Sequence, residues 1–171
     1  MEVDIFSTHR QDFNEVRRLC LICHGLDLTS DKLFTNSTYS NQLENTAAVF
    51  HNLFSGSLLR LAISIRVNLY QGKFHGQDDI VLSHCGFYFE DKSEAALNFT
   101  IKDVCDKIIH ADTITKAAMP ADRYGQVKLA ARLEGKKGKV SWALDLSIEM
   151  FTEAVLNYLD QLEAKETDVE N

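Results

Sequence analysis

Apolar side chains recur at steps of three and four residues in four segments of the chain, which is the spacing of amphipathic helices. The segments, with the residues that mark their ends, are 10–24 before Gly25, 46–71 from an N-cap at Thr46, 100–111 from a capping box of Thr100 and Asp103, and 148–163 from a cap at Ser147. The polar segment 29–42 is expected to connect the first two helices, and the acidic residues 164–171 to form a frayed tail.

Two segments near the end of the chain follow a different pattern, with apolar and polar residues alternating over 127–134 and 139–147. This period of two indicates strands, and the intervening Gly135-Lys-Lys-Gly138 suits the loop of a β-hairpin. The residues expected on its inward face are Val127, Leu129, Ala131, Leu133, Val140, Trp142, Leu144 and Leu146. The β-branched and aromatic content of 80–89 favours a further short strand. The expected fold is mainly α, an α+β helical bundle over 1–171 with an amphipathic hairpin at about 127–147.

Composition narrows the class of protein. The 171 residues are 45% hydrophobic and 25% charged with one proline, which excludes disordered and low-complexity chains. Acids outnumber Lys and Arg by 25 to 18, and a net charge of −7 disfavours a protein that coats DNA. The N-terminus lacks a signal-peptide pattern, and the apolar stretch 58–69 is too short to span a bilayer. We expect a cytoplasmic protein that does not enter the membrane.

The string Cys20-Leu-Ile-Cys23-His24 matches the attachment sequence of c-type haem. Haem attachment takes place outside the cytoplasm, and both cysteines lie on the inward stripe of the first helix, where thiols behave as small hydrophobes. A zinc site would need two more ligands, for which His84 and Cys85 are the candidates, but a second CxxC knuckle is missing. We expect reduced core cysteines, with no haem, metal or other cofactor.

Basic residues gather in a span of 17 positions that contains six of them and one acid, Glu134. The basic residues are Arg123, Lys128, Arg132, Lys136, Lys137 and Lys139. Such a strip on an exposed hairpin face suits binding of a phosphate backbone or an acidic partner. The alternative is a solvated face whose lysines prevent edge-to-edge pairing of strands.

Two groups of polar residues are candidates for chemistry. Lys102, Asp106 and His110 are spaced four and four apart, so they form one stripe on the third helix, where Asp106 could orient the imidazole for general acid–base work. The second group places Arg17 or Arg18 beside His24 on the first helix. The alternatives are an exposed ladder of ion pairs and ordinary surface residues.

The segment 100–111, TIKDVCDKIIHA, resembles part of small bacterial proteins of HEPN-like type, in which a polar cap leads into a helix ending in an Asn-Lys-Ile-Ile-His-Ala-like string. The hairpin and closing helix, with Trp142 and Phe151, are similar too, so the likeness spans about 100–162. The resemblance implies a helical, often dimeric protein from a toxin–antitoxin or phage-defence setting. The residues that match the string are Lys107, Ile108, Ile109, His110 and Ala111.

Active members of the HEPN group resemble one another as metal-independent RNases, with four to six residues between an arginine and a histidine. Here Lys102 stands at the matching place, and seven residues separate it from His110. The spacings of Arg17 and Arg18 to His24 fit the family pattern, although they lie in the first helix. Lysine lacks the planar fork with which arginine grips a phosphate. The expectation is therefore a non-catalytic interaction protein that self-associates or binds a protein partner. The alternatives are a metal-independent RNase and an RNA binder that uses the basic hairpin.

Overall fold

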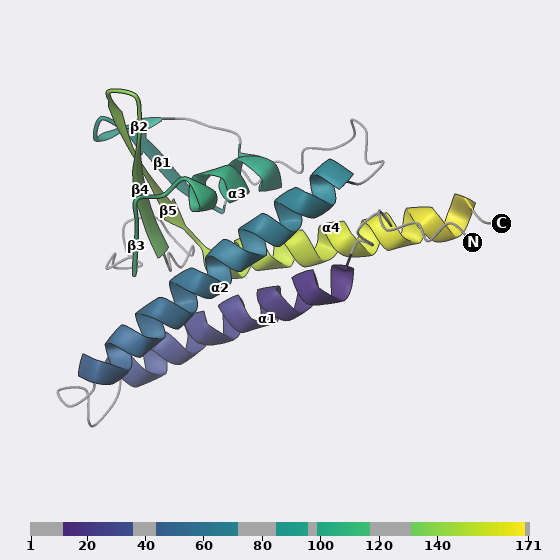
Figure 1. Ribbon diagram of the computed structural model, residues 1–171, viewed down its shortest axis with the longest axis horizontal. Helices are drawn as coiled ribbons and strands as arrows, with labels where there is room; N and C mark the ends of the chain where they lie inside the picture. The colour runs from purple at the N-terminus through teal and green to yellow at the C-terminus, as the bar shows by residue number, and fades with distance from the viewer. Residues whose placement is uncertain (1–11, 36–43, 72–84, 96–98, 117–130, 170–171) are drawn as a thin grey trace, which may run out of the picture.

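The computed structural model describes residues 12–35, 44–71, 85–95, 99–116 and 131–169. In these ranges the chain forms four α-helices, one π-helical turn and a five-stranded antiparallel sheet (Figure 1). The helices are α1 (Phe13–Ser30), α2 (Glu44–Gln71), α3 (Ile101–Ile109) and α4 (Ile148–Val169), and the π-turn η1 is Asp31–Thr35. The strands are β1 (Gly86–Glu90), β2 (Ser93–Ala95), β3 (Thr113–Lys116), β4 (Ala131–Lys137) and β5 (Val140–Leu146). The α+β class is confirmed.

Helices α1, α2 and α4 run lengthwise beside one another, and the sheet stands at one end of them (Figure 1). The strand order is β2-β1-β5-β4-β3, and α3 lies between the sheet and α2. The buried apolar residues of helices and sheet form one continuous core, in which Phe151 and Leu58 are fully enclosed. The expected inward stripe of α1 is confirmed, since Cys20 and Cys23 are buried, and on α3 Val104 and Ile108 are buried in the same core.

The sequence predicted that the first helix ends before Gly25, but α1 continues past this glycine. It continues to Ser30 and then into the π-turn, so part of the expected connection 29–42 is helical, while 36–43 lies outside the described residues. Asp27 and Ser30 are buried, and Ser30 Oγ donates to the Asp27 carbonyl at 2.8 Å. Tertiary burial of this last turn outweighs the modest intrinsic cost of an exposed helical glycine.

Helix α2 begins two residues before Thr46 and ends at Gln71, as expected, without a break at Ser55-Gly56-Ser57. Within the described residues, Asn45–Val67 is long and apolar enough to cross a membrane by length and composition, with 33% of the window buried in the fold. The expectation that the apolar stretch covers only 58–69 and is too short to span a bilayer is therefore wrong in length. A core helix of this length has the same composition, and α2 packs between α1 and α3.

The hairpin is confirmed where it is described, except that Val140, expected on its inward face, is 36% exposed beside the turn. The turn is also tighter than expected. Strand pairing continues to Lys137↔Val140, so Gly135 lies within β4 and only Gly138 and Lys139 form the turn. Gly138 has φ of +64°, a left-handed conformation that favours glycine. Residues 127–130 lie outside the described chain. Strands β2 and β3 were not expected, because segments of three and four residues carry too little periodic pattern.

The cap of α3 is confirmed, since Thr100 Oγ1 accepts from the Asp103 backbone and Asp103 Oδ2 accepts from the Thr100 backbone. Helix α3 ends at Ile109, two residues earlier than expected. Ser147 Oγ accepts weakly from the Met150 backbone at the start of α4. Helix α4 continues to Val169, beyond its expected end at 163.

Candidate functional site

The stripe of Lys102, Asp106 and His110 lies on α3 as expected, but its members do not act together. Lys102 is exposed. His110 caps the C-terminus of the helix, with its backbone N–H donating to the Asp106 carbonyl at 3.0 Å. The imidazole is exposed and makes no hydrogen bond or ion pair with the described part of the chain. The arrangement therefore shows no orientation of His110 by the Asp106 carboxylate.

Asp106 instead pairs with Arg66, a residue that the sequence analysis did not single out. The Nε atom of Arg66 on α2 lies 2.8 Å from Oδ1 of Asp106, and only 13% of the arginine side chain is exposed. The ion pair joins α2 to α3 and occupies the carboxylate. The signal in the sequence was weak, because 40 positions separate the two residues.

In the second predicted group, Arg17 and Arg18 form ion pairs with carboxylates and not a site with His24. Arg17 reaches across to α4, where its Nη2 atom lies 2.8 Å from Asp160 and 2.7 Å from Glu163, and these hydrogen bonds raise the pKa of the guanidinium. Arg18 pairs with Glu15 on its own helix at 2.6 Å. His24 is half-buried and contacts neither guanidinium through a hydrogen bond in the described chain. Arg17 thus serves as a clamp between α1 and α4.

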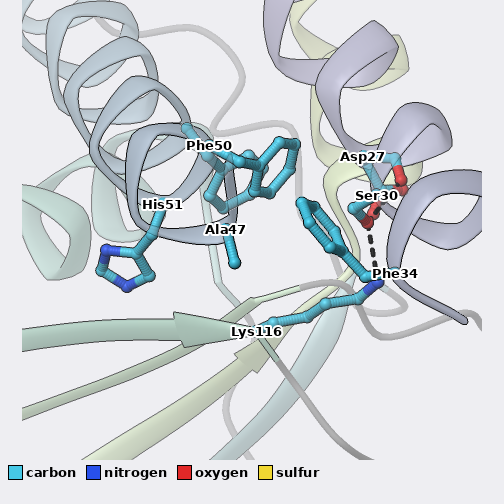
Figure 2. Close-up of a pocket in the computed structure, with 8 residues that line it drawn as sticks. Asp27, Ser30, Phe34, Ala47, Phe50, His51 and Lys116 are labelled. Atoms are coloured by element: carbon cyan, nitrogen blue, oxygen red, sulfur yellow. Dashed lines mark hydrogen bonds between the residues drawn. The ribbon is translucent and has the colours of Figure 1, made fainter. Parts of the chain in front are cut away.

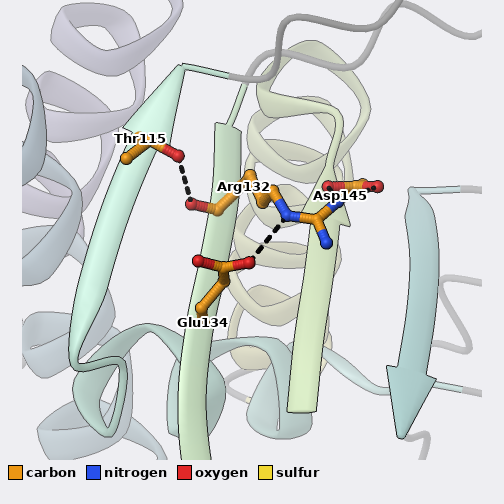
Figure 3. Close-up of polar contacts among 4 residues, drawn as sticks. All are labelled: Thr115, Arg132, Glu134 and Asp145. Atoms are coloured by element: carbon orange, nitrogen blue, oxygen red, sulfur yellow. Dashed lines mark hydrogen bonds and ion pairs between the residues drawn. The ribbon is translucent and has the colours of Figure 1, made fainter. Parts of the chain in front are cut away.

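Arg132, the central member of the basic strip, sits on the sheet between two carboxylates (Figure 3). Its Nη1 atom lies 3.1 Å from both oxygens of Asp145, and its Nε atom lies 3.0 Å from Glu134. Asp145 is fully buried, and burial raises the pKa of its carboxyl despite the opposing effect of Arg132. Arg132 therefore compensates a buried charge and is not a free phosphate ligand.

The rest of the basic strip that the structure describes lies at the end of the hairpin. Lys136, Lys137 and Lys139 are exposed, and they form no ion pair with the described part of the chain. Arg123 and Lys128 lie outside the described residues. The strip is reduced to a tip of three lysines.

Lys107, on the same helix as the predicted stripe, occupies a setting that the sequence did not indicate. Its Nζ atom lies 4.4 Å from the ring centroids of both Tyr88 and Trp142, and it donates to the Tyr88 hydroxyl at 2.8 Å. The Tyr88 hydroxyl in turn donates to Glu90 at 2.9 Å. Burial lowers the pKa of Lys107. These contacts fasten α3 to β1 and β5.

The four cysteines are buried and unpaired, as expected of core thiols. Burial raises the pKa of Cys20, Cys23 and Cys85 to about 12, so these thiols stay protonated and unreactive near neutral pH. Among the described residues, no three His, Cys, Asp or Glu side chains are grouped to hold a metal ion. His84 lies outside the described chain.

Two further features carry apolar surface. A cavity of about 230 Å³ opens between the end of α1, η1, the start of α2 and β3 (Figure 2). The outward side of α2, directly opposite its core-facing side, exposes four aliphatic residues that recur at helical spacing: Val49, Leu53, Ile63 and Val67. We call these four residues the α2 stripe.

Comparison of the chain with protein-family models, with curated protein sequences and with solved structures finds no match.

Proposed function

We propose that this chain is a non-catalytic, HEPN-like interaction protein that self-associates through the α2 stripe, in a bacterial or phage conflict system. The observation that carries the proposal is the exposure of the stripe, with Val49 67% and Leu53 53% accessible on a helix whose other side is core. The guanidiniums of the RNase-like candidates Arg17 and Arg18 are engaged by carboxylates, which also favours a non-catalytic role.

The spacing of the α2 stripe is self-complementary. Its four residues lie symmetrically about position 58 along the helix. The α2 helix of an antiparallel second copy therefore places Val49 opposite Val67 and Leu53 opposite Ile63. The same register sets Gly56 opposite Arg60, a small residue facing a large one. No atom lies within 4 Å of a Cβ added at Gly56, so no contact within the described chain requires a glycine there. A glycine inside a helix lowers stability by about 1 kcal/mol relative to alanine. Space for the Arg60 side chain of a second copy gives a reason for a glycine at position 56.

The exposed apolar area fits the core of a small interface. The α2 stripe with Leu59 exposes on the order of 400 Å² of apolar surface, which is within the range of the largest apolar patch on a typical monomer and about half of what one partner contributes to a standard interface. The exposed polar residues of α2 that flank the stripe, such as Asn52, would supply the rim.

Sedimentation analysis of purified protein over a range of concentrations tests this proposal. The wild-type chain is expected to form a dimer, and Leu53→Glu/Ile63→Glu to remain monomeric with an unchanged far-UV spectrum. The control is Leu21→Glu/Leu28→Glu, which alters exposed apolar residues on α1 outside the stripe. A wild-type monomer at high concentration, or equal loss of the dimer in the control, would overturn self-association through α2.

A second candidate function, RNA binding with or without cleavage, is favoured by the three lysines at the hairpin tip and by the exposed imidazole of His110. Incubation with mixed RNA in EDTA separates the possibilities. Cleavage that disappears in His110→Ala or His24→Ala would establish a metal-independent RNase and refute the non-catalytic proposal. A salt-sensitive gel shift that Lys136→Glu/Lys137→Glu abolishes would establish binding by the hairpin.

A further inference from the structure

The cavity between α1, η1, α2 and β3 has an aromatic wall built from two separate segments. Phe34 of η1 meets Phe50 of α2 edge to face, with ring centroids 5.2 Å apart, and Phe50 stacks on Phe54 at 6.0 Å. Ala47, one turn before Phe50, also lines the cavity (Figure 2). An apolar cavity of about 150 Å³ is known to accept benzene. The cavity volume of about 230 Å³ therefore accommodates one aromatic ring with a small substituent.

The polar groups that line the cavity are already engaged with one another and with the backbone. Lys116 Nζ donates to Ser30 Oγ at 2.7 Å, and the Ser30 hydroxyl donates to the Asp27 carbonyl at 2.8 Å (Figure 2). Asp27 and Lys116 each make a further interaction within the chain, and His51 Nε2 bonds to the Ile114 carbonyl at 2.6 Å. In the part of the chain that the structure describes, every buried polar side-chain atom has a hydrogen-bond partner. The polar lining therefore does not require a ligand as a hydrogen-bond partner.

The two charged groups of the lining are of opposite sign. Asp27 and Lys116 lie on the same side of the cavity, where Ser30 bonds to both residues (Figure 2). A charged ligand would lose water on entering this space, and the engaged groups of the lining would not replace it. An uncharged ring loses little hydration and replaces water against apolar walls, which is favourable. The lining therefore favours an uncharged ligand over an anion or a cation of the same shape.

The walls of the cavity are held in place by contacts between segments far apart in the chain. The bond between Lys116 and Ser30 joins β3 to the end of α1, and the bond between His51 and the Ile114 carbonyl joins α2 to β3. Phe34 is presented by a π-helical turn, a rare conformation that is frequent at functional sites. These contacts favour binding, because a preformed cavity takes up a ligand with little loss of conformational entropy.

We propose that this cavity binds a small, uncharged aromatic molecule, whose ring lies among Phe34, Phe50 and Phe54. Aromatic rings pack against one another in edge-to-face and offset-stacked geometries, which stabilise the contact beyond the burial of apolar area. The site does not depend on the proposed dimer, because Phe50 and Phe54 pack against the core, on the side of α2 opposite the α2 stripe. A failure of self-association would therefore leave this site unaffected.

Titration of the full chain with toluene, benzoate and benzylamine, followed by ligand-observed NMR, tests the proposal. The three probes share one ring with a one-carbon substituent and differ in charge. Toluene is expected to bind about tenfold or more tightly than either charged probe, because only the charged probes lose strong hydration. Intermolecular NOEs from toluene are expected to the ring protons of Phe34 and Phe50. No binding of toluene, binding of a charged probe within about tenfold of toluene, or NOEs to another part of the chain instead would overturn the proposal.

A variant that fills the cavity, with a matched control on the same helix, provides the second test. Ala47→Leu is expected to weaken toluene binding about tenfold or more, because the larger side chain occupies the space of the ring. Ala48→Leu makes the same change at the next position of α2, where the side chain is exposed and does not line the cavity, and should leave binding unchanged. Undiminished binding to Ala47→Leu, or equal loss in both variants, would refute the site. If Ala47→Leu does not fold, the NOEs in the wild-type chain decide between the two outcomes.

Discussion

The ammonium of Lys107 lies 4.4 Å above the ring of Trp142, which joins the short helix α3 to the central strand β5. The same ammonium lies equally close to the Tyr88 ring and donates to its hydroxyl. Cation–π contacts of this kind stabilise by about 0.5–2 kcal/mol, more as the cation loses water. Lys107 therefore acts as a fastening between helix and sheet, in the segment on which the HEPN resemblance rests.

Removal of the Lys107 side chain should lower the stability of the folded protein measurably. Lys107→Ala is expected to lower the free energy of unfolding by about 1–2 kcal/mol, because two ring contacts and one hydrogen bond are lost. Urea unfolding measures the change. Lys102→Ala, on the exposed side of the same helix, is the matched control and should change stability by less than about 0.5 kcal/mol. Equal effects of the two variants would contradict the role given to Lys107.

Two glycines that look alike in the sequence should respond oppositely to alanine. A Cβ at Gly135 would lie 2.4 Å from Cζ2 of Trp142 and 3.0 Å from the His110 carbonyl, so Gly135→Ala is expected to destabilise by about 1–3 kcal/mol and to alter the near-UV signal of Trp142. Gly25 is exposed in α1 with nothing within 4 Å, so Gly25→Ala should stabilise by about 1 kcal/mol. Thermal unfolding of both variants checks the signs.

The pairing of Arg132 with Asp145 predicts a large effect of truncation. Arg132→Met leaves a fully buried carboxylate without its cation, and is expected to cost about 3 kcal/mol or more. Glu134→Gln removes the exposed partner of the same arginine and should cost under about 1 kcal/mol. Urea unfolding at neutral pH compares them, and similar losses would show that Asp145 does not depend on Arg132.

Asp145 also predicts a dependence of stability on pH. Because burial raises its pKa in the folded chain, the folded state holds this proton more tightly than the unfolded state. Its contribution to stability is complete below the pKa of the unfolded chain and is lost as the pH rises through the folded value. The stability of the wild type relative to Asp145→Asn should therefore fall as the pH is raised above the ordinary pKa of an Asp carboxyl. A difference independent of pH would contradict the raised pKa.

The antiparallel register of the proposed dimer is open to cross-linking. Leu53→Cys and Ile63→Cys chains are mixed in equal amounts and oxidised, and the mixed disulfide is expected to exceed the two symmetric ones combined, because the register sets these positions face to face. The four native cysteines are buried and unreactive, which keeps the background low. Predominance of the symmetric disulfides would contradict the register while leaving self-association through α2 intact.

Local chemistry explains which parts of the fold were predictable. The capping box of Thr100 and Asp103 is complete within four consecutive residues, and the alternation of Leu144 and Leu146 with polar neighbours marks a strand without reference to other segments. The end of α1 was not predictable in this way. Gly25 is a valid stop signal locally, but burial of Asp27 and Ser30 against distant elements extends the helix past it.

The candidate sites also differ in whether neighbouring residues or distant segments determine them. The sequence by itself determined the amphipathic helices, the hairpin and the polar stripe of Lys102, Asp106 and His110, because helical and strand periodicity depend only on neighbours along the chain. Tertiary structure alone decided that Asp106 pairs with Arg66, that Arg132 compensates Asp145, and that Phe34 meets Phe50 beside a cavity. Ion pairs and cavities depend on distances between segments far apart in the chain, and packing of the core sets those distances.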